Sequence, residues 1–273
     1  MQRLFIFGLG YTAQRVAARA RAAGWHVDAT GSAGNIDFGD AASIRLVLAE
    51  ATHVLASVPP LVDGDPVLDG FGDALSGKWL GYLSSTGVYG DVGGAWVDES
   101  ALVRGRRASR NQADTDWLAR GARVFRLPGI YGPGRSALER VAEGKAHRVD
   151  LPGQVFSRVH VDDIAAGVVA AFGAPPGAYN LADDWPCDQN AVIAAAAALL
   201  GLPPPPFVAL ESLSPMARSF YGENRRVANG KAKRVLGWAP AYPDFTTGLR
   251  ALSAMSSPPS ATIPPPNASS DQR

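Results

Sequence analysis

The sequence predicts an α/β protein with a doubly wound parallel sheet and a smaller C-terminal lobe. Two observations predict this fold class. A glycine-rich turn stands directly between an apolar strand and a helix at the start of the chain, and apolar strands alternate with helical segments over the first 127 residues. Such alternation is typical of parallel sheets whose strands are joined by helical crossovers.

The glycine-rich turn is FGLGYTA, residues 7–13. In a dinucleotide-binding turn the first glycine, here Gly8, makes the tight turn, and the second, Gly10, lets the backbone approach a pyrophosphate. The third position needs only a small side chain, and Ala13 supplies one. The unpaired N–H groups at the start of the helix favour an anionic phosphate. We therefore predict a Rossmann-type cofactor site that includes Gly8, Leu9, Gly10, Tyr11 and Thr12.

The remaining elements follow in regular order. Apolar runs bounded by turn residues predict strands, and helix-forming segments lie between them. The predicted strands are 4–7, 25–30, 52–58, 79–85 and 122–127, and the predicted helices are 12–23, 41–50, a short one near Gly70, 112–121 and one starting near Asp188.

Right-handed crossovers place a ligand at the carboxyl ends of parallel strands. Four segments end strands in this way: the glycine turn, Ser57–Pro60, Ser84–Thr86 and Leu127–Gly129. We expect all four to converge on one crevice. Within it, we predict cofactor contacts from Ser57, Val58, Pro59, Ser84 and Pro128.

Composition excludes several classes of site. The 273 residues carry a net charge of +1, with no basic patch for nucleic acid. Cys187 is the one cysteine and cannot form an internal disulfide, and no Cys/His spacing predicts a metal site. No apolar run is long enough to cross a membrane, and no signal peptide is recognisable, so we expect a cytoplasmic protein, monomeric or homodimeric. The Pro/Ser-rich segment 256–273 predicts a disordered tail.

Five motifs in order carry a resemblance to a known family: YLSSTGVYG (82–90), RLPGIYGPGR (126–135), SRVHVDDIAAG (157–167), YNLADD (179–184) and RVLGWAPAYPDFTTGL (234–249). Together they resemble the extended branch of the short-chain dehydrogenase/reductase superfamily, which contains nucleotide-sugar epimerases and dehydratases. The short glycine turn resembles the atypical members of that superfamily. The resemblance implies an NAD(P)-binding Rossmann domain over 1–180 and a substrate-binding lobe over 181–255. Residues 131–156 lie within the first range but are expected to contribute to the lobe.

The sequence lacks the pair of residues on which the chemistry of that superfamily depends. The family uses Tyr-x-x-x-Lys on a helix, and none of the seven tyrosines has a lysine four residues later. Counting along the resemblance, the two positions fall on Arg106 and Arg110. Arginine stays protonated and cannot replace the proton-donating tyrosine, but it can hold a carboxylate or phosphate in a forked hydrogen bond. Alternatively, both arginines are solvated residues of a surface helix.

Four other residues are candidates for the site. Ser85 matches the family's catalytic Ser/Thr, which hydrogen-bonds the reacting oxygen. Tyr89 lies just past the end of the same strand and could replace the missing acid, although a buried, hydrogen-bonded tyrosine is the alternative. Tyr131 contacts either the nicotinamide region or a domain seam. His160 is expected to be a structural histidine.

The sequence thus predicts an NAD(P)-binding, epimerase/dehydratase-like oxidoreductase that acts on a small polar substrate, either anionic or nucleotide-linked. The catalytic residues would be Ser85, Tyr89, Arg106 and Arg110. The end of the second strand has no clear determinant for a ribose hydroxyl or a 2′-phosphate, so NAD and NADP both stay open. The competing hypothesis is a sensor or scaffold that binds the cofactor without catalysis.

Overall fold

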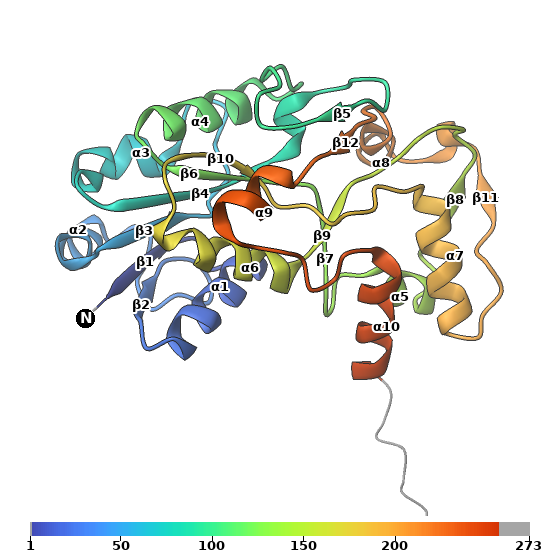
Figure 1. Ribbon diagram of the computed structural model, residues 1–273, viewed down its shortest axis with the longest axis horizontal. Helices are drawn as coiled ribbons and strands as arrows, with labels where there is room; N and C mark the ends of the chain where they lie inside the picture. The colour runs from blue at the N-terminus through green and yellow to red at the C-terminus, as the bar shows by residue number, and fades with distance from the viewer. Residues whose placement is uncertain (1, 257–273) are drawn as a thin grey trace, which may run out of the picture.

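The structure is a computed structural model that describes residues 2–256 (Figure 1). Its strands are β1 (Arg3–Phe7), β2 (His26–Ala29), β3 (His53–Ala56), β4 (Trp79–Ser85), β5 (Trp96–Val97), β6 (Arg123–Leu127), β7 (Gly129–Tyr131), β8 (Arg148–Val149), β9 (Arg158–His160), β10 (Gly177–Asn180), β11 (Phe207–Val208) and β12 (Arg226–Val227).

The α-helices of the described residues are α1 (Tyr11–Ala22), α2 (Ala41–Glu50), α3 (Pro66–Phe71), α4 (Ala108–Ala119), α5 (Ala137–Ala142), α6 (Val161–Ala170), α7 (Gln189–Leu199), α8 (Pro215–Phe220), α9 (Gly230–Leu236) and α10 (Phe245–Ser256). Short 3-10 turns are η1 (Gly72–Leu75), η2 (Thr86–Tyr89), η3 (Ala171–Gly173) and η4 (Leu210–Ser212).

Six strands form the central sheet in the order β10-β6-β4-β3-β1-β2. All its neighbours pair in parallel, with Phe5 opposite both Asp28 of β2 and Val54 of β3. After β2 the chain returns to the other side of β1, so the strand order reverses between β1 and β3. Doubly wound sheets bind ligands at such a switch point, outside the carboxyl ends of the strands.

Strand β1 shows why helices cover both faces of the sheet. Leu4 and Ile6 pack with α1 and α6, whereas Phe5 and Phe7 pack with α2, α3 and α4. Successive side chains of a strand point to opposite faces, so a fully apolar strand needs a cover on each side. The apolar run that predicted β1 therefore also predicts the three-layer arrangement seen in Figure 1.

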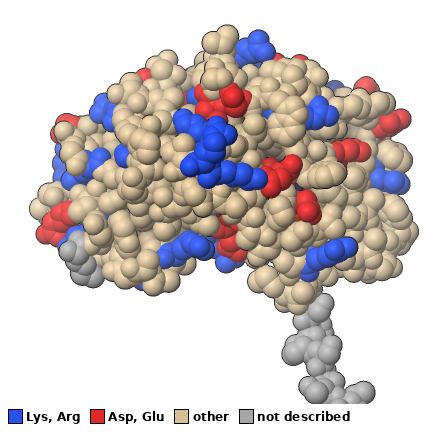
Figure 2. Space-filling model, viewed as in Figure 1, with Lys and Arg blue, Asp and Glu red and all other residues tan. Residues whose placement is uncertain are grey.

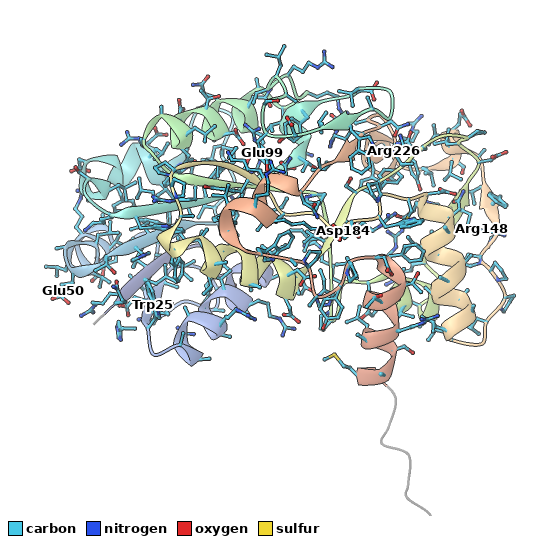
Figure 3. The ribbon with its side chains drawn as sticks, in the orientation of Figure 1. Trp25, Glu50, Glu99, Arg148, Asp184 and Arg226 are labelled. Carbon is cyan, nitrogen blue, oxygen red and sulfur yellow. The ribbon has the colours of Figure 1, made fainter. Side chains whose placement is uncertain are left out.

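A separate apolar cluster lies beyond the sheet, where Figure 1 shows α5, α7 and α10 side by side. Leu138 of α5, Ile193 of α7 and Leu249 of α10 are buried in it. Arg148 joins β8 to the chain before β11, because its Nε donates to Pro205 O at 2.7 Å (Figure 3). Helix α9 belongs to the sheet instead, since Ala232 is buried in the cluster formed by β1, α1 and α6.

Most predicted elements are present with shifted ends. Helix α2 has the predicted bounds, β4 does too, and α3 is the short helix expected near Gly70. Helix α4 begins at Ala108, four residues before the predicted start, because its polar first turn shows no apolar periodicity. The predicted disordered tail, 256–273, lies outside the described residues except for Ser256, which ends α10.

No helix within residues 2–256 is long and apolar enough to cross a membrane. On the face shown in Figure 2, acidic and basic side chains are interspersed over a largely uncharged surface.

Candidate active site

The glycine turn adopts the conformation its sequence predicts. Gly8 has φ of +84°, a left-handed value that favours glycine, and its N–H donates to Thr30 Oγ1 at 3.1 Å. The N–H of Leu9 donates to Thr30 O at 2.7 Å. Thr30 directly follows β2, and its two oxygens accept from the N–H groups of Gly8 and Leu9. The first half of the turn is therefore fixed against the sheet.

Two of the four segments that were predicted to converge, the glycine turn and the end of β3, are in contact. A Cβ added to Gly8 would lie 3.0 Å from Val58 Cγ2 and 3.4 Å from the carbonyl carbon of Ser57. Ser57 N also donates to Phe7 O at 2.8 Å, while the neighbouring Pro59 is exposed. The ends of β1 and β3 are therefore in contact at the switch point.

The start of α1 fits an anionic group. Gly10 is the N-cap residue and has no side chain to pair with the N–H groups of the first turn. A Cβ added to Gly10 would meet nothing within 4 Å, which leaves room for a ligand against the backbone. Ala13 is fully buried between helix and strand, as the third position of such a turn requires. These residues fit the pyrophosphate of a dinucleotide.

The end of β2 gives no carboxylate to an adenosine ribose. Asp28 accepts from Asn35 Nδ2 at 2.9 Å and lies 2.9 Å from His26 Nε2. It is also opposite Phe5, in the middle of the strand. Asp37 lies further along and accepts from Gly39 N. The choice between NAD and NADP is therefore not fixed by an acidic residue at this position.

A cavity of about 940 Å³ opens beside the carboxyl end of β4. Ser85, Pro128 and Tyr131 line it from the sheet side, and residues of α4, α5, α7, α8, α10 and the chain around β9 line most of the rest. Its basic lining residues are Arg106, Arg107, Arg110, Arg135, Arg140, Arg158 and Arg225, and its acidic ones are Glu139, Glu143 and Glu223. The lining therefore carries an excess of positive charge, which would favour an anionic ligand.

The two arginines predicted at the positions of the missing pair both line this cavity, but they do not share a helix face. Arg106 precedes α4 and donates to Glu223 Oε1 at 2.7 Å and to Ser219 O at 2.8 Å. Arg110 lies in the first turn of α4 and donates to Tyr82 OH at 3.0 Å. Arg110 therefore keeps donors for a ligand, whereas Arg106 is neutralised by Glu223.

Ser85 stands where the prediction put it, and Ser84 and Tyr89 point elsewhere. The Ser85 side chain lines the cavity and accepts from Gly87 N at 3.1 Å. Ser84 is buried and donates to Asp114 Oδ2 at 2.6 Å. Tyr89 is 1% exposed, its hydroxyl donates to Asn180 Oδ1 at 2.7 Å, and burial raises its pKa.

A buried ion pair supports this strand end. Arg126, 2% exposed, donates to both carboxyl oxygens of Asp114, at 2.7 and 3.1 Å, and also to Tyr89 OH. The network ties β4, α4, β6 and β10 together and includes Ser84, the residue next to Ser85. Tyr89 is thus a buried, hydrogen-bonded tyrosine, as the alternative prediction had it, and it does not line the cavity.

Tyr131 lies at the seam between the sheet and the second apolar cluster. Its hydroxyl is buried, has no hydrogen-bond partner among residues 2–256, and would collide with a Cβ on Gly248 of α10. His160 packs against its ring, with centroids 5.2 Å apart, and the Nδ1 of His160 accepts from Asp162 N. His160 therefore caps α6, as expected of a structural histidine.

Tyr11 connects the glycine turn with the cavity. Its hydroxyl donates to Pro133 O at 3.1 Å, and the guanidinium of Arg135 lies 5.7 Å from the centre of its ring. Since Arg135 lines the cavity, Tyr11 links the start of α1, which follows the glycine turn, to the rim of the cavity. No group of three metal-binding side chains occurs among residues 2–256.

The sequence did not point to most of the arginines of the cavity. Arg107, Arg135, Arg140, Arg158 and Arg225 lie on separate segments spread over more than a hundred residues. Only Arg135 and Arg158 fall in motifs that the resemblance singled out. The remaining signal was the excess of arginine over lysine, which is equally typical of solvated helix faces.

Comparison with known proteins gives the same fold. No protein-family model matches the chain. Its structure superimposes with a TM-score of 0.76 on the dTDP-glucose 4,6-dehydratase of Bacillus anthracis in complex with NAD, at 15% identity and covering 93% of this chain and 96% of that one. The protein therefore has the Rossmann-type fold of NAD-dependent epimerases and dehydratases, as the resemblance to extended short-chain dehydrogenases implied.

A second structure is more similar in sequence. A functionally unknown conserved protein from Silicibacter pomeroyi is 41% identical, with a TM-score of 0.84, covering 93% of this chain and 99% of that one. The chain belongs to the same family as that protein.

A match to a curated protein is partial. A 3-diazoavenalumate denitrifying reductase from a Streptomyces species is 30% identical over 138 residues, which are 46% of this chain and 45% of that protein. The matched part spans less than half of the reductase.

Proposed function

We propose that this protein is an NAD(P)-dependent oxidoreductase that acts on a small anionic substrate. The observation that carries the proposal is the arginine-lined cavity beside Ser85, whose rim Tyr11 links to the glycine turn. The turn would hold the pyrophosphate through Gly8, Gly10 and the start of α1, and Ser57, Val58 and Pro59 would cover its far side.

The nicotinamide would supply or accept a hydride at the cavity, where Pro128 and Tyr131 lie. Ser85 would hydrogen-bond the reacting oxygen, and Arg110 would orient the anion through the donors that Tyr82 leaves available. The relatives are consistent with this class of reaction, since one is in complex with NAD and another is a reductase. A nucleotide-linked substrate, which is also negatively charged, is the alternative.

The experiment is a screen of reductase activity on purified protein. We would follow oxidation of NADH and NADPH with a panel of small carboxylates, phosphates and nucleotide sugars. Ser85→Ala should lower turnover of an accepted substrate about tenfold or more, because a hydrogen bond that stabilises the transition state is lost. Ser100→Ala, an exposed serine far from the cavity lining, should leave it unchanged.

The same screen distinguishes an enzyme from a sensor that binds the cofactor without catalysis. A sensor would bind NADH or NADPH and show no turnover with any member of the panel. Equal rates for the wild type and Ser85→Ala would remove Ser85 from the catalytic residues.

A further inference from the structure

The ionisable groups of the cavity differ in kind from those that usually move protons in oxidoreductases. Those lining it are seven arginines, three glutamates and Tyr131. Within residues 2–256, the lining has no lysine, histidine, cysteine or aspartate. General acid catalysis needs a group that exchanges a proton near the working pH.

None of these groups is a proton donor for a bound substrate near neutral pH. Arginine does not lose its proton. The Tyr131 hydroxyl is fully buried and faces α10 at Gly248. Burial opposes ionisation of Glu139 and Glu223, but hydrogen bonds from Ser136 and Arg106 respectively prevail and lower both pKa values. Glu143 is paired with Lys145 at 2.7 Å.

Apolar side chains make up much of the remaining lining. The larger ones are Leu127, Ile130, Val155, Phe156, Val192, Phe220, Phe245 and Leu249. Phe156 and Phe220 stack with their ring centres 4.7 Å apart. Polar residues are also present, but the side chains of Ser136, Ser157 and Gln189 already pair with Glu139, Val227 N and Arg158. A cavity that combines arginines with these apolar groups suits a carboxylate on an apolar body better than a sugar, whose many hydroxyls need polar partners.

Arg110 is fixed close to the strand end that carries Ser85. Its Nη1 donates to Tyr82 OH, and Tyr82 lies in β4 three residues before Ser85. Tyr82 is fully buried and stacks on Trp117 with ring centres 5.4 Å apart, so this anchor is rigid. The remaining N–H groups of Arg110 are available to the cavity that it lines.

We propose that the cavity binds a small carboxylate with an apolar, conjugated body, and that Arg110 and Ser85 stabilise the negative charge of its reduced form in place of a proton-donating phenol. This inference rests on the proposed function. The hydride and its electron pair pass from the reduced nicotinamide, which is oxidised, to the carbon β to the carboxylate. The π pair of the C=C bond moves towards the carboxylate, and the α carbon then takes a proton from water. A fixed guanidinium stabilises this anion without transferring a proton.

The test is equilibrium binding by calorimetry, which does not depend on turnover. The probes are trans-cinnamate and its neutral analogue trans-cinnamamide, each titrated into the full-length protein with saturating NADP⁺ or NAD⁺. Cinnamate should bind at least about tenfold more tightly than the amide, since a charge-assisted hydrogen bond is lost in the amide. Its affinity should stay constant from about pH 6 to about pH 9, because neither arginine nor the carboxylate titrates there.

Variants locate the charge. Arg110→Gln should weaken cinnamate binding about tenfold or more and leave cinnamamide unchanged. Arg234→Gln, an exposed arginine outside the cavity lining, is the matched control and should change neither. Titration of each variant with NADPH and NADH verifies that it is folded and separates this test from that of the proposed function.

Several results would overturn the inference in a protein that binds the dinucleotide. One is equal affinity for cinnamate and cinnamamide, and another is no binding of either. The others are unchanged cinnamate binding by Arg110→Gln and a cinnamate affinity that changes between about pH 6 and pH 9. Binding of UDP-glucose with no binding of cinnamate would likewise reject the conjugated carboxylate while leaving an anionic substrate in place.

Discussion

Asp183, three residues after β10, is a buried carboxyl. It is 2% exposed, and no side chain among the described residues donates a hydrogen bond to it. Burial raises its pKa to about 8, and the charge of Arg158 and the nearby backbone N–H groups of Trp185 and Arg158 oppose this only in part. Asp183 does not cap the helix that follows, because the cap of α7 is Asp188, whose side chain accepts from Asn190 N.

This carboxyl should make stability depend on pH. An unfolded aspartate ionises near pH 4. Between about pH 4 and pH 8 the unfolded chain has lost this proton while the folded protein keeps it, so the free energy of unfolding falls as pH rises, by up to about 1.4 kcal/mol per pH unit. Asp183→Asn should remove this decline, which urea denaturation at several pH values across the window would measure.

The matched control is the neighbouring Asp184→Asn. Asp184 is exposed and pairs with Lys233 at 2.6 Å (Figure 3), so its replacement should keep the wild-type slope. The same slope in Asp183→Asn and the wild type would show that Asp183 is ionised in the folded protein.

At the residue scale, sequence pattern predicted the groups whose roles follow from local backbone geometry. Gly8 and Gly10 are examples, because a tight turn and an open backbone depend on few neighbours. The contacts of Ser84, Tyr89 and Asp183 depend on partners 30 to 91 positions away or on burial at a seam, and no local pattern reports these. For Arg106 the decisive partner, Glu223, lies 117 positions along the chain.

Helix α4 joins the candidate site to the core. Its Asp114 is fully buried, pairs with Arg126 of β6 and accepts from Ser84 of β4. Its Arg110 reaches the cavity one turn earlier. Helix α4 therefore positions the cavity residue Arg110 and also carries Asp114, the carboxylate that neutralises the buried Arg126.

Breaking the buried pair should destabilise the protein strongly. Asp114→Asn leaves the guanidinium of Arg126 buried without a counter-charge, so we expect a loss of about 3–5 kcal/mol in the free energy of unfolding. Asp116→Asn, on the same helix, removes only the charge of a carboxylate that accepts an exposed hydrogen bond from Gln112, and it should change stability by less than about 0.5 kcal/mol. Urea denaturation of both variants is the measurement, and similar losses in the two would contradict the assigned role of Asp114.

At the element scale, apolar pattern predicted the sheet well and the helix ends less well. The strands β1, β3, β4 and β6 are buried on both faces and therefore read as continuous apolar runs. The start of α4 escaped the pattern because its first turn is polar and partly exposed. The short pairs β5–β12 and β8–β11 have two residues per strand, too few for any periodicity.

The whole molecule brings two sites together at one edge of the sheet. The topology predicted from the alternation of strands and helices fixes the position of the glycine turn at the β1/β3 switch point. The cavity is lined largely by segments from α5 to α10. How these segments pack together was not predictable from local patterns. We propose that the sheet with its covering helices and the apolar cluster of α5, α7 and α10 enclose one cofactor and one anionic substrate.

The central claim is that the glycine turn binds a nicotinamide dinucleotide. Gly10 has a φ of −87°, which any residue adopts, and open space where its side chain would be, so Gly10→Trp fills the proposed pyrophosphate position without backbone strain. Gly173→Trp is the matched control, because Gly173 is also exposed with nothing within 4 Å of an added Cβ and lies in η3, after α6, away from the turn.

The measurement is a titration of the wild type and the two variants with NADH and NADPH, followed by nicotinamide fluorescence. The account predicts that the wild type and Gly173→Trp bind at least one of the two dinucleotides and that Gly10→Trp binds neither. Unchanged affinity in Gly10→Trp, or no binding by a folded wild type freed of carried-over nucleotide, would contradict it.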